Sequence, residues 1–401
     1  MPPMPLSGLD ISGRAALTAA LFVACGSPTR TTSVPSVAAA APRAPSCEWD
    51  KAYNDFARED QPRDVRRVFE LGDRPAYIVS DQELRHIYVR DLDTNAQLAE
   101  LAVPATQGMD VMADDVLVTP GGPLVFVTGS LPPKDQGDLA VTSGYWLVPI
   151  DRAGKAGAAI TLPLPAAYGW EISLIAVGDY LVAHMVVPSD LPDFEIGEDI
   201  PYQPEESHLV ILDRGGNVVK SAREVDVAQI VAVGDSAFAA LFSDKKGFST
   251  GVRVFDIARR DWAGPVVQTG FHVMDVSAVG DRALLAATPS PIDKVGDEFP
   301  ISLASVRATG EVSSWKPVDG KVTEVTFAPA VEPGLALLMT THPVDDKRSA
   351  MQITAVNAEL AMARAPGRIE PPPMRGVSTL TRPEAIYMAA WGRVQRLACR
   401  Q

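Results

Sequence analysis

The densest group of chemically capable side chains is an acidic stretch in the middle of the chain. Residues 190–206 read DLPDFEIGEDIPYQPEE, with no basic residue and with Phe194 and Tyr202 between the acids. The seven carboxylates are Asp190, Asp193, Glu195, Glu198, Asp199, Glu205 and Glu206. Their hard oxygens could hold Ca²⁺, or their charge could meet a basic partner. A solvated acidic loop without a ligand is the interpretation we favour.

A second candidate calcium motif lies earlier in the chain. Asp91, Asp93 and Asn95 are spaced like the first ligands of an EF-hand loop. Ala96 stands where that loop requires glycine, and Ala102 where the bidentate glutamate belongs. We therefore predict a hairpin turn here.

The remaining candidate groups are isolated. Residues 247–251 (GFSTG) match the G-x-S-x-G hydrolase pattern, which needs a helix after the serine. The strand-like run VRVFDI follows instead, so we predict a chance match. The histidines are scattered without metal-ligand spacing: His86, His184, His208, His272 and His342. His184 and His208 accompany apolar strands, where hydrogen-bonded core histidines are usual, and we expect no resident metal or cofactor.

The first 25 residues have the features of an export signal. The apolar run 15–24 (AALTAALFVA) follows Arg14 and ends at Cys25. Ten helical residues at about 1.5 Å each cannot span a hydrocarbon core of about 30 Å, so we predict a cleaved signal peptide over 1–24. Residues 25–46 are rich in Pro, Ala, Ser and Thr, which predicts an extended tether before a folded domain over 47–401.

The junction Leu21-Phe22-Val23-Ala24-Cys25-Gly26 resembles the lipobox of bacterial lipoproteins. The resemblance implies acylation of Cys25, which becomes the new N-terminus and carries the lipid anchor. Gly26 after the cysteine, rather than Asp, favours the outer membrane. A plain secretory signal is the alternative.

Two further cysteines bracket the expected domain. If Cys25 is acylated, only Cys47 and Cys399 remain. In an oxidising compartment we expect them to form a disulfide, which requires the two ends of the domain to meet; two buried, unpaired cysteines are the alternative.

A repeat of roughly fifty residues organises the chain. The segments 175–187, 231–243 and 277–289 each contain an apolar run, a Gly-Asp turn and a second apolar run. Weaker copies surround Gly72, Gly122, Gly334 and Pro383. A second hairpin follows each of the first six copies, so each unit supplies four antiparallel strands. Seven such units predict an all-β propeller with seven four-stranded blades, and six or eight blades are the alternatives.

The seventh unit is too short for a fourth strand, so ring closure must use another segment. Trp49, Tyr53 and Phe56 follow helical spacing. We expect a short amphipathic helix after Cys47 in place of the missing strand, with the Cys47–Cys399 bond joining the two ends of the ring.

The repeats resemble the WD-like and quinoprotein-type propeller superfamily, as in the turn Asp91-Leu92-Asp93-Thr94-Asn95. The chain lacks the repeated Trp-Asp and Gly-His signatures and the tryptophan-docking repeats of quinoprotein dehydrogenases, so we infer no quinone cofactor.

Composition and loop lengths limit the classes of partner and function that the sequence favours. A formal charge of −14 disfavours nucleic acid as a partner. The longest loops are expected on one face of the ring, where repeat proteins usually bind: 130–142, 188–206, 243–250, 289–300 and 342–349. We predict a lipid-anchored, non-catalytic binding or scaffold module of the cell envelope with a protein or glycan partner. The alternatives are a hydrolase or lyase with a carboxylate or Ca²⁺-assisted site in the propeller channel, and a subunit of an outer-membrane assembly.

Overall fold

A computed structural model describes thirteen stretches of the chain: residues 42–50, 65–80, 85–119, 121–131, 141–168, 172–186, 206–244, 248–289, 297–345, 348–365, 368–369, 378–390 and 393–400. The chain divides into two units, Met1–Ala38 and Ala39–Gln401. All described residues belong to the second unit. Within them every regular element is a β-strand.

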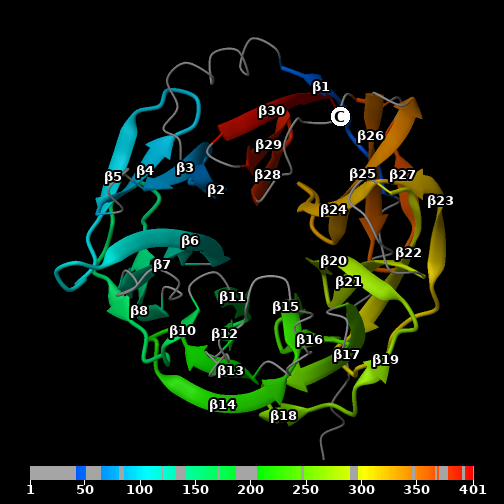
Figure 1. The fold of residues 1–401 in the computed structure, drawn as a ribbon. Helices are drawn as coiled ribbons and strands as arrows, with labels where there is room; N and C mark the ends of the chain where they lie inside the picture. The colour runs from blue at the N-terminus through cyan, green and yellow to red at the C-terminus, as the bar shows by residue number, and fades with distance from the viewer. Residues whose placement is uncertain are drawn as a thin grey trace, which may run out of the picture. The chain divides into compact units, whose positions relative to one another are not determined.

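The strands form seven antiparallel sheets arranged around a common centre, the blades of a propeller (Figure 1). Blade 1 consists of β2 (Val65–Leu71), β3 (Arg74–Ser80), β4 (Ile87–Asp91) and β5 (Gln97–Leu101). Blade 2 consists of β6 (Asp110–Thr119), β7 (Gly122–Leu131) and β8 (Val141–Pro149), with the short strands β9 (Ile160–Thr161) and β10 (Ala167–Tyr168) both paired to β8. Blade 3 consists of β11 (Ile172–Val177), β12 (Tyr180–Val186), β13 (Glu206–Asp213) and β14 (Val218–Val225).

The next three blades repeat this order. Blade 4 consists of β15 (Val227–Val233), β16 (Ala237–Ser243) and β17 (Ser249–Asp256), with β18 (Asp261–Trp262) and β19 (Val267–Gln268) both paired to β17. Blade 5 consists of β20 (His272–Val279), β21 (Arg282–Thr288), β22 (Phe299–Arg307) and β23 (Lys316–Val322). Blade 6 consists of β24 (Glu324–Pro329), β25 (Leu335–Asp345), β26 (Arg348–Asn357) and β27 (Met362–Arg364). The prediction of seven blades is confirmed.

Blade 7 is built from both ends of the domain. Its first three strands are β28 (Ser378–Arg382), β29 (Ala385–Ala390) and β30 (Arg393–Arg400), and its fourth is β1 (Ser46–Trp49). In register, Cys47 lies opposite Cys399 and Trp49 opposite Leu397. The predicted helix is wrong at Trp49, which lies in a strand paired with β30. The other two positions of the predicted helix, Tyr53 and Phe56, lie outside the described residues.

Burial differs between the inner and the outer strands of a blade. In β12 every residue after Tyr180 is buried, because the second strand of a blade packs against the blades on both sides. In β14, the outer strand of the same blade, exposed positions alternate with half-buried ones. Continuous apolar runs thus mark the second strands, which explains why they dominate the sequence repeat.

Seven buried apolar clusters fill the seven interfaces between neighbouring blades of the described structure. The cluster between blades 7 and 1 joins Val68 and Tyr77 to Tyr387 and Val394. Because this last interface is packed with apolar side chains like the other six, the ring closes through its core.

Tight Gly-Asp turns join the first two strands of several blades. Gly178 and Gly234 have φ values of 55° and 62°, which favour glycine. A Cβ on Gly178 would also overlap the carbonyl oxygen of Asp235 in the equivalent turn of blade 4. Glycine at Gly178 thus permits both the turn and the close approach of the neighbouring blade.

Candidate functional site

The connections between strands divide the domain into two different faces. The first two strands are joined by two residues in blades 1, 3 and 5, at 72–73, 178–179 and 280–281. The second and third strands are joined at the opposite end by longer segments, including 132–140, 187–205 and 289–298. Because every blade repeats the same strand order outward from the centre, the ends of the second strands and the starts of the third strands lie on one face, which we call the long-connection face. The turns between the first and second strands lie on the opposite face, which we call the short-turn face.

One of the expected long loops is short. Residues 342–349 were predicted to form a loop, but β25 continues to Asp345 and β26 begins at Arg348. Ladder pairs His342–Ala350 and Pro343–Ser349 extend the hairpin. Most of this segment therefore belongs to the two strands of a hairpin and not to a long loop.

The acidic stretch occupies the connection between β12 and β13. Asp190, Asp193, Glu195, Glu198, Asp199 and Glu205 lie outside the described residues. Glu206 begins β13, where its Oε1 lies 3.2 Å from His208 Nε2 and 3.2 Å from Arg223 Nη1. The solvated loop that we favour and the alternative ligand site therefore both stay predictions.

The segment that resembles an EF-hand forms a hairpin turn between β4 and β5, as predicted. Asp91 Oδ1 accepts hydrogen bonds from the backbone N–H of Asp93 (3.0 Å) and Thr94 (2.8 Å) and from the Thr94 hydroxyl (2.9 Å). Asn95 adopts a left-handed φ of 57°. The Asp91 carboxylate therefore satisfies backbone donors of its own turn.

The same side-chain cap recurs in other blades on the short-turn face. Asp151, Asp213 and Asn357 each accept hydrogen bonds from two backbone N–H groups of the turn that follows them. At Asp213, hydrogen bonds from the Asn217 side chain and backbone lower the carboxyl pKa. These Asp and Asn residues stabilise turns, and they occupy equivalent positions in their blades.

Ser249 of the hydrolase-like motif is the first residue of β17 and pairs with Ser243 of β16. A strand follows the serine where a hydrolase nucleophile requires a helix. The predicted strand after the serine is confirmed, and Gly247 lies outside the described residues.

His184 is a core residue of blade 3, as predicted. It is buried in β12, and its Nε2 lies 3.4 Å from the Ser207 hydroxyl. Burial lowers the pKa of His184 to about 4, opposed by a backbone hydrogen bond at Val227. The imidazole is therefore neutral near pH 7 and contributes packing and polar contacts between blades 3 and 4.

The other histidines belong to separate blades or separate contacts. His86 Nδ1 lies 2.9 Å from Glu100, His272 packs edge-on against Phe248, and His342 Nδ1 lies 2.9 Å from the Lys321 carbonyl. Burial lowers the pKa of His342. Across the thirteen described stretches, no three His, Cys, Asp or Glu residues are grouped so that they could hold a metal ion.

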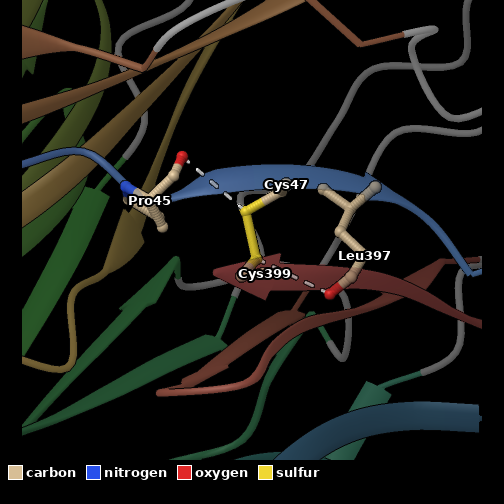
Figure 2. Close-up of a disulfide and its surroundings, with 4 residues drawn as sticks. All are labelled: Pro45, Cys47, Leu397 and Cys399. Carbon is tan, nitrogen blue, oxygen red and sulfur yellow. Dashed lines mark hydrogen bonds between the residues drawn. A yellow bond between two sulfur atoms is a disulfide. The ribbon is translucent and has the colours of Figure 1, made fainter. Parts of the chain in front are cut away.

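Cys47 and Cys399 form a disulfide with a Cα–Cα distance of 4.1 Å. The bond joins β1 to β30 across a sequence separation of 352 residues, as Figure 2 shows. The predicted pairing is confirmed. Cys25, the predicted acylation site, lies outside the described residues.

A set of polar residues in the first strands was missed by the sequence analysis. Six blades carry a polar residue four positions before the end of the first strand, and blade 6 carries Val325 there. We call these the inner polar positions; they are Arg67, Asp115, Ser173, Gln229, Asp275 and Ser378. Their constant distance from the turn is the sequence signal that could have revealed them.

Several inner polar positions bond to the next blade around the ring. Arg67 Nε donates to Asp115 Oδ1 at 3.1 Å, linking blades 1 and 2. Ser378 Oγ accepts from the Val68 N–H at 3.1 Å, linking blades 7 and 1. Asp275 Oδ2 accepts from the Phe327 N–H at 2.6 Å, linking blades 5 and 6. The Ser378 and Asp275 side chains thus satisfy backbone N–H groups on the first strand of the next blade, whereas the Arg67–Asp115 contact joins two side chains.

Comparison with known proteins supports no closer relation than a shared fold. No protein-family model matches the sequence, and no curated protein matches it significantly. Solved propeller structures are similar at low identity. Hydrazine synthase of Kuenenia stuttgartiensis has a TM-score of 0.48 and 15% identity over 84% of this chain and 96% of that chain. The β-propeller domain of the trilobed protease from Pyrococcus furiosus has a TM-score of 0.45 and 12% identity over 83% and 92%. Virginiamycin B lyase from Staphylococcus aureus has a TM-score of 0.44 and 11% identity over 84% and 96%.

Within the stretches of the chain that the structure describes, no helix is long and apolar enough to span a bilayer.

Proposed function

We propose that the chain is a lipid-anchored protein of the bacterial cell envelope whose propeller binds a protein or glycan through its long-connection face. The placement in the outer membrane and the relation to the WD-like and quinoprotein-type superfamily belong to the same proposal. Catalysis is not part of it.

The observation that carries the binding role is the difference between the two faces. Short turns capped by their own Asp and Asn side chains cover one face. On the opposite face, β7, β12 and β21 end and β8, β13 and β22 begin, and the sequence between these strand ends is long. Long connections on a rigid repeat scaffold are where binding surfaces are usually found, since their length and sequence can vary without disturbing the blades.

The anchor is supported by the sequence around Cys25 and by the point where the tether joins the domain. Residues 26–46 have the composition of an extended linker. They lead into β1, the outer strand of blade 7, which the Cys47–Cys399 disulfide fixes to β30. A tether attached there leaves the long-connection face without a covalent attachment to the anchor.

Site-specific photo-crosslinking in the native envelope tests the binding role. A crosslinking residue at Glu298, beside the 289–298 connection, is compared with one at Asp281, in the short turn of the same blade; both positions are exposed. We expect Glu298 to capture a discrete envelope partner and Asp281 to capture none. Equal capture from both faces, or capture from Asp281 alone, would contradict the proposal.

Fractionation of a Cys25→Ser variant tests the anchor separately. The native protein should remain with membranes and carry the mass of acyl chains on a chain beginning at Cys25. The variant should lose the acyl mass and leave the membrane fraction. A native protein without acyl mass would reject the anchor. The crosslinking experiment would still test the binding role, because it does not depend on the acyl chains.

A further inference from the structure

A cavity of about 310 Å³ lies where blade 5 meets blade 6. Its lining comes from the start of β21, the end of β22, the segment before β23, the start of β23, and the turn between β26 and β27. These segments belong to the short-turn face, opposite the connections assigned to the proposed function. The volume lies at the lower end of the range of small-molecule sites.

Two cations in this lining are held in fixed positions. Arg282, whose side chain is 16% exposed, donates from Nη1 to the Ala358 carbonyl at 3.0 Å. Lys316 donates from Nζ to the Leu360 carbonyl at 2.8 Å. Both carbonyls belong to one turn, so the two cations are attached to the same short piece of backbone.

That turn is itself well ordered by local bonds. Asn357 Oδ1 accepts from the N–H groups of Glu359 (3.1 Å) and Ala361 (2.8 Å). Leu360 adopts a left-handed φ of 61°. A ligand that binds here would not have to order the cations first, which reduces the entropic cost of binding.

The cations keep donor capacity beyond these contacts. A guanidinium has five N–H donors and an ammonium three, whereas the carbonyl contacts use one donor of each group. The carboxylates near Arg282 are exposed and hydrated: Glu359 Oε1 lies 3.3 Å from Nη2 with 53% side-chain exposure, and Asp281 Oδ1 lies 3.8 Å from Nε with 87% exposure. Backbone carbonyls carry no net charge, and among the described residues the carboxylates paired with Arg282 are these two exposed ones.

The repeat does not require a cation at this place. The first residue of the second strand is Arg282 in blade 5, but it is Tyr180 in blade 3 and Ala237 in blade 4. Ser313 and Ser314 add hydroxyl groups to the lining, and the Ser313 hydroxyl accepts from the Ser305 N–H at 2.9 Å. Cations with spare donors beside hydroxyl groups are typical of sites for carboxylate and phosphate groups.

We propose that this cavity between blades 5 and 6 binds the carboxylate or phosphate group of a small polar ligand through Arg282 and Lys316. Glu359 competes with the ligand for the guanidinium. The site is independent of the proposed partner on the long-connection face.

Calorimetric titration of the folded domain with inorganic phosphate and with glucuronate tests the inference and distinguishes the two sources of the oxyanion; methyl glucoside is the uncharged control. We expect saturable binding of at least one anion with a dissociation constant below about 10 mM at low ionic strength, weakening as salt is added. Lys316→Gln should weaken binding about tenfold, the loss of one charge-assisted contact. Glu359→Gln should strengthen it several-fold.

The matched control is Arg307→Gln, which removes an arginine of the same face that pairs with Glu311 at 2.8 Å and does not line the cavity. Its affinity should equal that of the unchanged domain. The increase expected for Glu359→Gln separates a binding site from a folding defect, because a damaged domain loses affinity. Absence of saturable binding by both anions, or unchanged affinity in Lys316→Gln, overturns the inference.

Discussion

Blade 3 and blade 7 have the same four-stranded order but are assembled differently. In blade 3 the strands β11 to β14 follow one another in the sequence. In blade 7 the outer strand β1 comes from the opposite end of the domain and is joined to β30 by the disulfide. Pairing β1 with β30 closes a loop of nearly the whole domain, which costs more chain entropy than a local hairpin. The disulfide therefore lies in the blade whose fourth strand does not follow its third strand in the sequence.

Removing the disulfide should have the largest effect on this comparison. For Cys47→Ala combined with Cys399→Ala, we expect the free energy of unfolding to fall by about 4–5 kcal/mol, since the bond closes a very long loop. Urea unfolding measures the change, with Cys25→Ser as the control that leaves the bond intact. A loss below about 1 kcal/mol would show that β1 needs no covalent support.

The pH dependence of stability tests the contribution of His184, a buried polar side chain in the core of blade 3. In the unfolded chain this histidine titrates near its ordinary pKa of about 6.5, whereas the folded pKa is about 4. Below pH 6.5 the unfolded state binds a proton that the folded state excludes. Stability should therefore fall as the pH drops from about 6.5 to 4, by about 3 kcal/mol from this residue.

The measurement for His184 is urea unfolding at several pH values between 4 and 7. His184→Gln should flatten the pH dependence. The buried His342 acts in the same direction, so part of the slope should remain. A slope that is identical with and without His184 would contradict the assignment.

Two of the inner polar positions allow the interface between blades 7 and 1, which closes the ring, to be compared with the interface between blades 5 and 6. Asp275→Ala leaves the Phe327 N–H without its carboxylate acceptor and should cost about 2 kcal/mol. Ser378→Ala removes the hydroxyl from the Val68 N–H and should cost about 1 kcal/mol, because a neutral acceptor contributes less. Urea unfolding of both variants measures the difference. A larger loss for Ser378→Ala would mean that the closing interface depends more on this contact than the internal interface does.

Ion pairs beside the disulfide should have the smallest effect. Arg396 Nη1 lies 2.9 Å from Asp50 Oδ2 with both side chains largely buried, whereas Arg400 Nη2 lies 3.5 Å from Glu48 with both exposed. Arg396→Gln should cost at most about 1 kcal/mol, and Arg400→Gln should be indistinguishable from the unchanged domain. Urea unfolding measures the free energy of unfolding of both variants. Equal losses in the two variants would contradict this ranking.

Most of the fold could be predicted from the sequence because its signals are local. The second strands are continuous apolar runs beside Gly-Asp turns, as at Gly178, and these turns need a positive φ that glycine provides. The Cys47–Cys399 pairing followed from composition and from the expectation that the ends meet. These features require no knowledge of distant segments.

The errors arose where distant segments decide the structure. The spacing of Trp49, Tyr53 and Phe56 favours a helix, but residues 46–49 meet the free edge of β30, which no local pattern reveals. Asp275 and Ser378 look like ordinary polar positions of a strand until the neighbouring blade supplies Phe327 and Val68.

The most direct test of ring closure by β1 is a peptide map of the membrane-extracted native protein with thiol labelling before and after reduction. The account predicts a non-reduced peptide that links Cys47 to Cys399, and two labelled thiols that appear only after reduction, because the proposed acylation of Cys25 would block its thiol. Free thiols at Cys47 and Cys399 in the non-reduced protein would contradict the covalently closed seventh blade.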